Sequence, residues 1–251
     1  MITGATGGFG AHFSRQLLEK GAKVILSDYN GETLNSFARS LDHQNVLGTI
    51  DSDLSSASGA DQLYEQSQTF GTVDVLINNA GIALIGRHDE VPRDAWDRLM
   101  QVNLMAPMRL CALFSPKMIE QRSGHLVNIS SLAGWIGTKG LSAYVASKHG
   151  LRGFSTALND DLKAHNVKVS AVYPYFSDTP ILDSPQFGEF AKEQRQDRLK
   201  GVTKPENVVR RTITGIEAND LHIFPDPTSR AVVRVQRFAP WLLPIIDRTV
   251  S

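Results

Sequence analysis

The sequence predicts an α/β domain in which a doubly wound parallel sheet is covered by helices on both faces, a three-layer α/β/α arrangement. Apolar runs of strand length alternate with longer segments of helical periodicity along the whole chain. The length of 251 residues suits one large domain better than two small ones. No shift in composition, internal repeat or low-complexity tract marks a boundary. We therefore expect a single domain with right-handed crossovers.

The alternation of patterns gives each element an approximate position. Strands are expected near residues 23–28, 45–50, 73–78, 124–130, 167–172 and 221–224. Helices are expected near residues 9–20, 32–42, 57–70, 105–121, 141–164 and 205–217. A further strand should precede the Gly-rich segment that opens the chain, but only Met1 and Ile2 stand before Thr3. Because a strand usually needs about five residues, we expect a few native residues to precede Met1 in the natural protein.

Composition narrows the function classes. The chain has 26 basic and 26 acidic residues and no basic stripe, so nucleic-acid binding is not expected. Its seven His residues are scattered without metal-ligand spacing, and no metal site is expected. The single Cys111 excludes an internal disulfide and fits a reducing compartment. Prolines interrupt the apolar stretch 238–246, which is far shorter than the ~20 residues that span a bilayer. We expect a cytoplasmic protein.

The segment Thr3-Gly4-Ala5-Thr6-Gly7-Gly8-Phe9-Gly10 leads directly into the first predicted helix. Glycines there allow a tight turn and a close approach of the backbone to a pyrophosphate, which the helix N-terminus can bind. A plain strand-to-helix turn is the alternative. Two glycine spacings fit the segment, Gly4/Gly8/Gly10 and Gly4/Gly7/Gly10.

Two acidic residues follow this turn at informative positions. Asp28 ends the next strand eighteen residues after Gly10, where a carboxylate can bind an adenosine ribose hydroxyl and repel a 2′-phosphate. The turn contains no Lys or Arg, and Tyr29 follows Asp28, so the pattern favours NAD over NADP. Asp53 could accept a hydrogen bond from the adenine amino group, with the Leu54 backbone helping. Their alternatives are a loop or helix N-terminal acid for Asp28 and an acid near a helix N-cap for Asp53.

The candidate chemistry lies in the second half of the chain. Tyr144 and Lys148 are four residues apart in a segment of helical period, so they share one helix face. A free phenol titrates near 10, and a neighbouring cation can lower that pKa by roughly 1–3 units. Alone, this pair would more often be a surface pair. Ser131, however, directly follows the strand at 124–130, and the carboxyl ends of strands are where open α/β sheets bind ligands.

The tetrapeptide Asn78-Asn79-Ala80-Gly81 closes the preceding strand in the same way. Two amides and a glycine there suit a polar turn beside a dinucleotide, and a turn with Asx hydrogen bonding is the alternative. With these features in order, the chain resembles the short-chain dehydrogenase/reductase family in its single-domain branch, which has the Rossmann fold. The matching features are Thr3–Gly10, Asp28, Asp53-Leu54, Asn78–Gly81, Asn103, Ser131, Tyr144, Lys148 and Pro174 to Thr179. They also favour the Gly4/Gly8/Gly10 spacing.

The resemblance implies an enzyme that transfers hydride between NAD(H) and a secondary alcohol or ketone. Tyr144 would be the acid/base, Lys148 would lower its pKa and hold the nicotinamide ribose, and Ser131 would donate to the substrate oxygen. Asn103 would hold a water linking Lys148 to solvent; a mid-helix Asn that caps backbone groups is the alternative. The implied cofactor contacts are Thr3, Gly4, Gly8, Phe9, Gly10, Asp28, Asp53, Leu54, Asn79, Ala80, Gly81, Tyr144, Lys148, Pro174, Phe176 and Thr179. The chain departs from the family pattern where Tyr175, rather than Gly, follows Pro174.

The segment at about 177–200 is expected to form a lid over the substrate. It contains Ile181, Leu182, Phe187 and Phe190. Together with Trp135, Ile136 and Leu141, which lie between Ser131 and Tyr144, these residues are expected to give the pocket a largely apolar wall. This composition favours a hydrophobic alcohol or ketone as the small-molecule substrate.

The assembly and one rival function are also expectations from the sequence. The resemblance suggests a homodimer or homotetramer built through the helices at 105–121 and 141–164. The apolar C-terminal tail at about 227–251 could dock on its own domain, on a partner subunit or on a membrane surface. A catalytically silent dinucleotide-sensing protein of the same fold is the alternative function, but a sensor has no need of Ser131, Tyr144 and Lys148.

Overall fold

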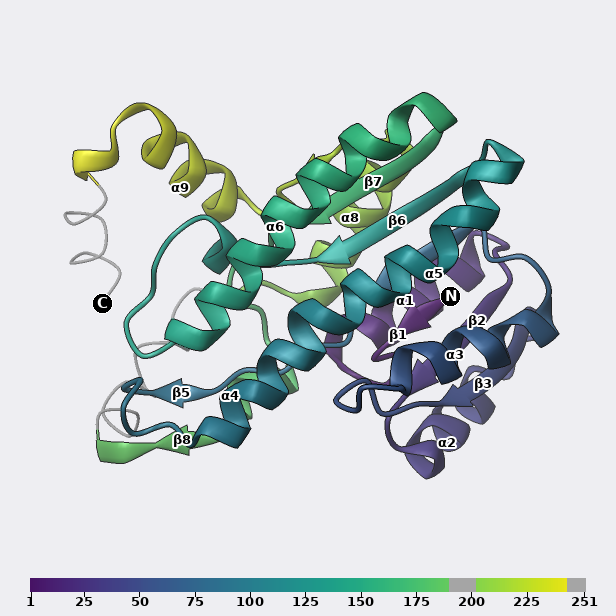
Figure 1. Ribbon diagram of the computed structural model, residues 1–251, viewed down its shortest axis with the longest axis horizontal. Coiled ribbons are helices and arrows are strands. Elements are labelled where there is room, and N and C mark those ends of the chain that lie inside the picture. The colour runs from purple at the N-terminus through teal and green to yellow at the C-terminus, as the bar shows by residue number, and fades with distance from the viewer. Residues whose placement is uncertain (190–201, 243–251) are drawn as a thin grey trace.

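The computed structural model describes residues 1–189 and 202–242 (Figure 1). Within them, seven strands form one parallel sheet in the order β3-β2-β1-β4-β6-β7-β9. The strands are β1 (Ile2–Thr3), β2 (Val24–Asp28), β3 (Val46–Asp51), β4 (Val75–Asn78), β6 (Gly124–Ile129), β7 (Val167–Val172) and β9 (His222–Ile223). The order reverses at β1, so the chain winds outward in both directions from the Gly-rich turn. The predicted doubly wound fold is confirmed.

Helices cover both faces of this sheet (Figure 1). On one face lie α1 (Gly8–Glu19), α2 (Gly31–Leu41) and α8 (Pro205–Glu217), whose apolar residues share one core with the sheet. On the other face lie α3 (Gly59–Ser67), α5 (Ala106–Gln121) and α6 (Ser142–Leu162), which share a second core. These strands and helices lie within a few residues of the ranges predicted from the sequence.

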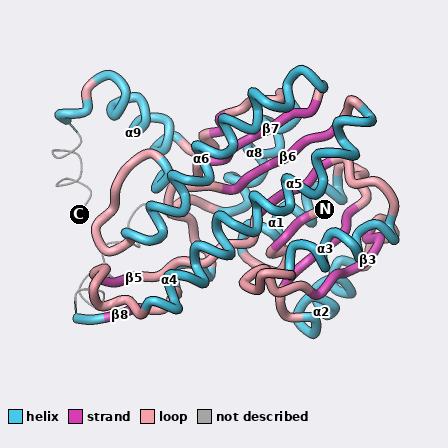
Figure 2. The backbone as a smooth tube through the Cα atoms, viewed as in Figure 1, coloured by secondary structure: helices cyan, strands magenta, loops and turns pink. Residues whose placement is uncertain are grey.

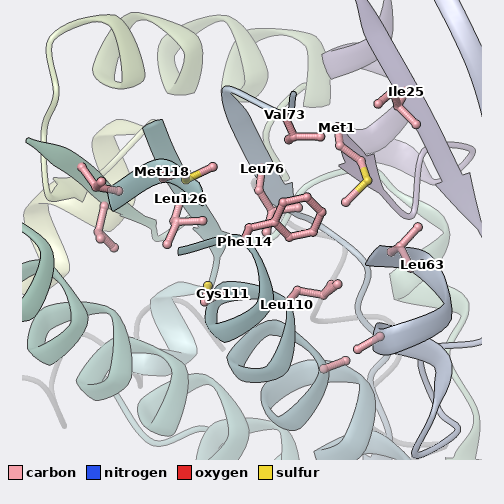
Figure 3. Close-up of a cluster of buried hydrophobic side chains, with 14 of the residues drawn as sticks. Met1, Ile25, Leu63, Val73, Leu76, Leu110, Cys111, Phe114, Met118 and Leu126 are labelled. Carbon is pink, nitrogen blue, oxygen red and sulfur yellow. The ribbon is translucent and has the colours of Figure 1, made fainter. Parts of the chain in front are cut away.

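The second core shows why these helices pack where they do (Figure 3). Leu110, Phe114 and Met118 recur at helical spacing along α5 and are at most 4% exposed. Cys111 lies among them, and burial raises the pKa of its thiol to about 12. The thiol is therefore a neutral core group. None of the described helices combines the length and the apolar character needed to cross a bilayer.

Several elements were not predicted from the sequence. They are α4 (Arg93–Met100), a π-helical turn η2 (Gln101–Met105) that joins it to α5, and α9 (Pro227–Phe238). A second sheet pairs β5 (Ile85–Gly86) with β8 (Gln186–Phe187) in parallel, beside α4 and apart from the main sheet (Figure 2). Short 3-10 turns complete the described chain: η1 (Gln68–Phe70), η3 (Leu132–Gly134), η4 (Lys163–His165), η5 (Pro180–Asp183) and η7 (Pro240–Leu242).

Candidate active site

The Gly-rich turn lies between β1 and α1 at the carboxyl edge of the sheet. Gly4 has φ 62°, and a Cβ there would lie 2.8 Å from Ala80 Cα. A Cβ at Gly10 would overlap the carbonyl oxygen of Gly4. The turn therefore requires glycine at both ends, as the sequence predicts, because the backbone folds tightly on itself and on the end of β4.

The turn also leaves an anion site. Gly7 caps α1 without a side-chain hydrogen bond, and the first turn of α1 contains no acidic residue. The N–H groups of a helix's first turn have no intrahelical acceptor, and the helix dipole makes this end positive. The residues present therefore fit the pyrophosphate of a dinucleotide.

Asn79 and Thr3 tie the Gly-rich turn to the end of β4. Asn79 Nδ2 donates to the carbonyl oxygens of Thr3 and Gly4, at 3.0 Å each. Thr3 Oγ1 accepts from the backbone N–H groups of Asn79 at 3.0 Å and Ala80 at 3.1 Å. The Asn79 side chain thus braces the predicted cofactor turn.

The two predicted adenosine-binding acids differ in their environment. Asp28 is only 7% exposed; its Oδ2 accepts from Thr6 N at 3.0 Å and Thr6 Oγ1 at 2.6 Å, and its Oδ1 accepts from Tyr29 N at 2.8 Å. Asp53 is exposed and accepts a hydrogen bond from Ser55 N at 2.9 Å. Hydrogen bonding by Ser55 lowers the pKa of Asp53. The contact between Thr6 and Asp28 was not predicted from the sequence.

Ser131, Tyr144 and Lys148 come together at the carboxyl end of β6. Ser131 follows β6, and the other two lie on adjacent turns of α6. The Ser131 side chain lies close enough to Tyr144 to lower the pKa of its phenol. Lys148 Nζ donates to Ile129 O at 2.9 Å and lies 5.6 Å from the centroid of the Tyr144 ring. All three residues line one cavity, as the sequence predicts.

Burial sets the protonation of this group. It raises the pKa of Tyr144, an effect that the neighbouring Ser131 side chain partly offsets. It lowers the pKa of Lys148 to about 8. The sequence led us to expect a lowered pKa for Tyr144; in the structure the loss of solvent around the phenolate outweighs the effect of Ser131.

Asn103 lies in the π-helical turn η2 and is fully buried. Its Oδ1 accepts from Ile82 N at 2.9 Å, and its Nδ2 donates to Ile82 O at 2.8 Å and Ser147 Oγ at 3.2 Å. A Cβ at Gly81 would lie 3.4 Å from Asn103 Oδ1 and 3.6 Å from Lys148 Nζ. Asn103 therefore holds the loop after β4 against the amine of Lys148, and π turns of this kind are frequent at functional sites.

The segment after β7 closes the site from the other side. Pro174 O accepts from Leu132 N at 2.9 Å, and Thr179 packs so tightly against Gly8 that a Cβ at Gly8 would overlap it. Tyr175 N, at the departure from the family pattern, donates to Asp226 Oδ2 at 2.9 Å. Asp226 also caps α9 through Ser229 N at 2.7 Å. Asp226 was not predicted, although Asp followed by Pro227 is a helix-start signal.

The cavity wall is largely apolar. Ile136, Leu141, Ile181 and Leu182 line it as predicted, and so do Phe9, Pro174, Phe176 and Thr179 among the predicted cofactor residues. Ala83 and Ile85, which were not predicted, line it as well.

The prediction that Trp135 forms part of this wall is wrong. Its ring packs against Tyr173, His222 and Phe224, and Arg152 Cζ lies 3.9 Å from its centroid. The lid segment is described as far as residue 189, which includes η5 and β8, and Phe190 lies outside the described residues.

Comparison with known proteins agrees with this geometry. A family model described as short chain dehydrogenase matches residues 1–186. An uncharacterized oxidoreductase of Staphylococcus aureus is 32% identical over 219 residues, which are 85% of this chain and 94% of the relative. The 3-oxoacyl-acyl-carrier-protein reductase of Thermotoga maritima is 33% identical over 216 residues, 84% of this chain and 86% of the relative.

Solved structures show the same similarity. A short-chain dehydrogenase/reductase from Burkholderia phymatum in complex with NAD has a TM-score of 0.87 at 26% identity, covering 96% of this chain and 93% of that one. A short-chain dehydrogenase from Sphingobium yanoikuyae in complex with NADPH has a TM-score of 0.83 at the same identity and coverage.

Proposed function

The chain belongs to the short-chain dehydrogenase family and is an oxidoreductase, and on that premise we propose that it interconverts a hydrophobic secondary alcohol and its ketone with NAD(H). The observation that carries the proposal is that Ser131, Tyr144 and Lys148 line one largely apolar cavity. When bound, the nicotinamide dinucleotide accepts or supplies the hydride.

The chain's own residues hold and move the proton at the substrate oxygen. Because burial raises its pKa, Tyr144 keeps its proton at neutral pH and can donate it to a carbonyl oxygen in the reductive direction. In the oxidative direction the phenolate takes the proton from the alcohol. Ser131 donates to the same oxygen, and the charge of Lys148 favours the phenolate. Asn103 keeps Lys148 and the loop at Gly81 together.

The cofactor would lie along the carboxyl edge of the sheet. The first turn of α1 and Gly4, Gly8 and Gly10 would hold the pyrophosphate, and Asp28 the adenosine ribose. Asp28 accepts three hydrogen bonds in the structure, as an ionised carboxylate does. Such a group can accept a further bond from a ribose hydroxyl, whereas it would repel a 2′-phosphate, so the contacts support a preference for NAD(H). NADH should therefore bind more tightly than NADPH, and Asp28→Ala should narrow the gap. Equal affinities in a fluorescence titration of the wild type would refute this preference.

Hydrophobic substrates are supported by the apolar residues around the Ser131–Tyr144 pair. Ile85, Leu141, Phe176 and Ile181 surround the cavity from four different segments of the chain. A series of alcohols of increasing chain length and ring size, followed by NADH absorbance, should show kcat/KM rising with apolar bulk.

The decisive test of the reaction is Tyr144→Phe. This variant keeps the ring and its packing but removes the proton, so turnover should fall at least ~100-fold while NADH binding stays nearly unchanged. Turnover that survives with phenylalanine at this position would refute the assigned role. Wild-type protein that binds NADH but turns over no alcohol or ketone would instead favour a dinucleotide sensor.

A further inference from the structure

We propose that Thr6 is a positioning residue for cofactor choice: its hydroxyl fixes Asp28 and makes the Thr6–Asp28 pair a site that only accepts hydrogen bonds. This inference rests on the proposed preference for NAD(H). Thr6 lies in the middle of the Gly-rich turn, and Asp28 lies at the end of the neighbouring strand β2. The side chains meet at the edge where the adenosine end of the cofactor would lie.

The contact is a double one. Both donors of Thr6, its backbone N–H at 3.0 Å and its hydroxyl at 2.6 Å, bond the same oxygen, Asp28 Oδ2. The second oxygen, Oδ1, accepts from Tyr29 N at 2.8 Å. Asp28 is 7% exposed, so these protein donors, rather than solvent, set the direction of its carboxylate. The backbone bond would remain with any residue except proline at position 6, whereas the hydroxyl bond depends on Thr or Ser.

The chemistry of the pair follows from counting donors and acceptors. A carboxylate has about four acceptor positions, and three are in use, so about one is left for a ligand. A hydroxyl has one proton, and Thr6 gives it to Asp28, which leaves its oxygen as an acceptor. The pair thus offers lone pairs and no proton. A ribose 2′-hydroxyl can donate to such a site, whereas a 2′-phosphate brings negative charge and acceptors of its own.

The test is a fluorescence titration of the whole chain with NADH and with NADPH, for wild type, Thr6→Val, Thr6→Ser, Asp28→Ala and the double variant Thr6→Val/Asp28→Ala. Thr6→Val keeps the β-branched shape and removes the hydroxyl. We expect this variant to bind NADH about tenfold more weakly and NADPH with unchanged affinity. The tenfold loss corresponds to one hydrogen bond to a charged group. Thr6→Ser should bind NADH within about twofold of wild type, since it restores the donor.

The double variant gives the second readout, because the effects of the two substitutions on NADH affinity should not add. With Asp28 replaced by Ala, Thr6 has no carboxylate to orient, so Thr6→Val should cause no further loss of NADH affinity. Thermal unfolding of each variant checks the fold, and Thr6→Ala replaces Thr6→Val if the valine variant does not fold.

The outcomes separate this inference from the proposal beneath it. Three results would show that Thr6 only braces the turn. Thr6→Val could lower the NADH and NADPH affinities equally, it could lower neither, or its effect could persist when Asp28 is replaced by Ala. The inference would then be overturned while the role of Asp28 stands. An unchanged NADH-to-NADPH ratio in Asp28→Ala would overturn both.

Discussion

At the scale of single residues, the most costly group in the cavity is the amine of Lys148. Lys148 is 4% exposed, and its amine donates a hydrogen bond to Ile129 O. Removing a charged amine from water is unfavourable, and this burial lowers the pKa of Lys148 to about 8. A position chosen for stability alone would be apolar, so a buried lysine here is what we expect if the proposed active site is kept at a cost in stability.

Lys148→Met should therefore stabilise the fold while it reduces activity. Near pH 7 we expect the variant to gain about 1–3 kcal/mol in the free energy of unfolding, since methionine fills the site without charge. Between pH 8 and about 10.5 the folded wild type loses this proton before the unfolded chain does, so its stability rises and the gap narrows. Urea denaturation at several pH values measures this gap. Lys23→Met, at an exposed lysine, should unfold with nearly the same free energy as wild type. A difference between Lys148→Met and wild type that widens as the pH rises would contradict this expectation.

The residues of the site could be predicted where spacing carries the information. Tyr144 and Lys148 at four residues apart, and Ser131 just after a strand, follow from helix and sheet periodicity. The Thr6–Asp28 contact could not be found this way, because it depends on how two turns from separate crossovers meet. The prediction for Trp135 was wrong for the same reason, because its partners Tyr173 and Phe224 come from distant parts of the chain.

At the scale of elements, the π-helical turn η2 shows how a loop and a helix are joined. Asn103 satisfies both the N–H and the carbonyl of Ile82, which lies in the loop after β4. Asn103→Leu would leave both backbone groups without partners in a buried site. We expect a loss of about 2–4 kcal/mol in unfolding free energy and a fall in kcat, measured by urea denaturation and NADH absorbance. Gln101→Ala, in the same turn, should be nearly neutral; equal effects at the two positions would argue against the contact.

The small β5–β8 sheet gives a second prediction at this scale. Gly188 follows β8 with φ 73°, and a Cβ there would overlap the carboxylate of Glu90. Gly188→Ala should therefore disturb the lid segment just after β8, at a cost of roughly 1–2 kcal/mol. We expect the KM for substrate to rise while the Kd for NADH stays unchanged. Gly137→Ala is the matched control, because nothing lies within 4 Å of its added Cβ. A change in NADH affinity alone would contradict this assignment.

Elements could be predicted from the sequence in proportion to their apolar content. Strands β2, β6 and β7 are apolar runs, and α1 and α5 have long apolar stripes. By contrast, α4 buries Leu99 alone, and α9 buries Ser229 and Val233. Strands β5 and β8 have two residues each and exist through their pairing with each other. Local periodicity cannot reveal elements that tertiary contacts create.

At the scale of the whole molecule, the surface of α6 supports the proposed homodimer or homotetramer. Ala146, Gly153 and Ala157 are exposed and recur at helical spacing, so a second helix could approach this face closely. Light scattering should give a mass two or four times 27.6 kDa. Gly153→Arg should reduce it to the monomer, whereas Ser36→Arg, on exposed α2, should leave it unchanged. A wild-type monomer would refute the proposal.

The central position of β1 has a consequence for how the chain reaches its fold. Ile2 pairs with Leu26 on one side and Ile77 on the other, and Thr3 bonds to residues 74 to 77 positions later. During synthesis, β1 therefore cannot pair with its second neighbouring strand until β4 has been made. Because closing such distant contacts is slow, the Gly-rich turn gains its native surroundings later than the pair β2 and β3, whose strands are close in the sequence. Until β4 has been made, chaperones and proteases would meet this protein with its Gly-rich turn still open.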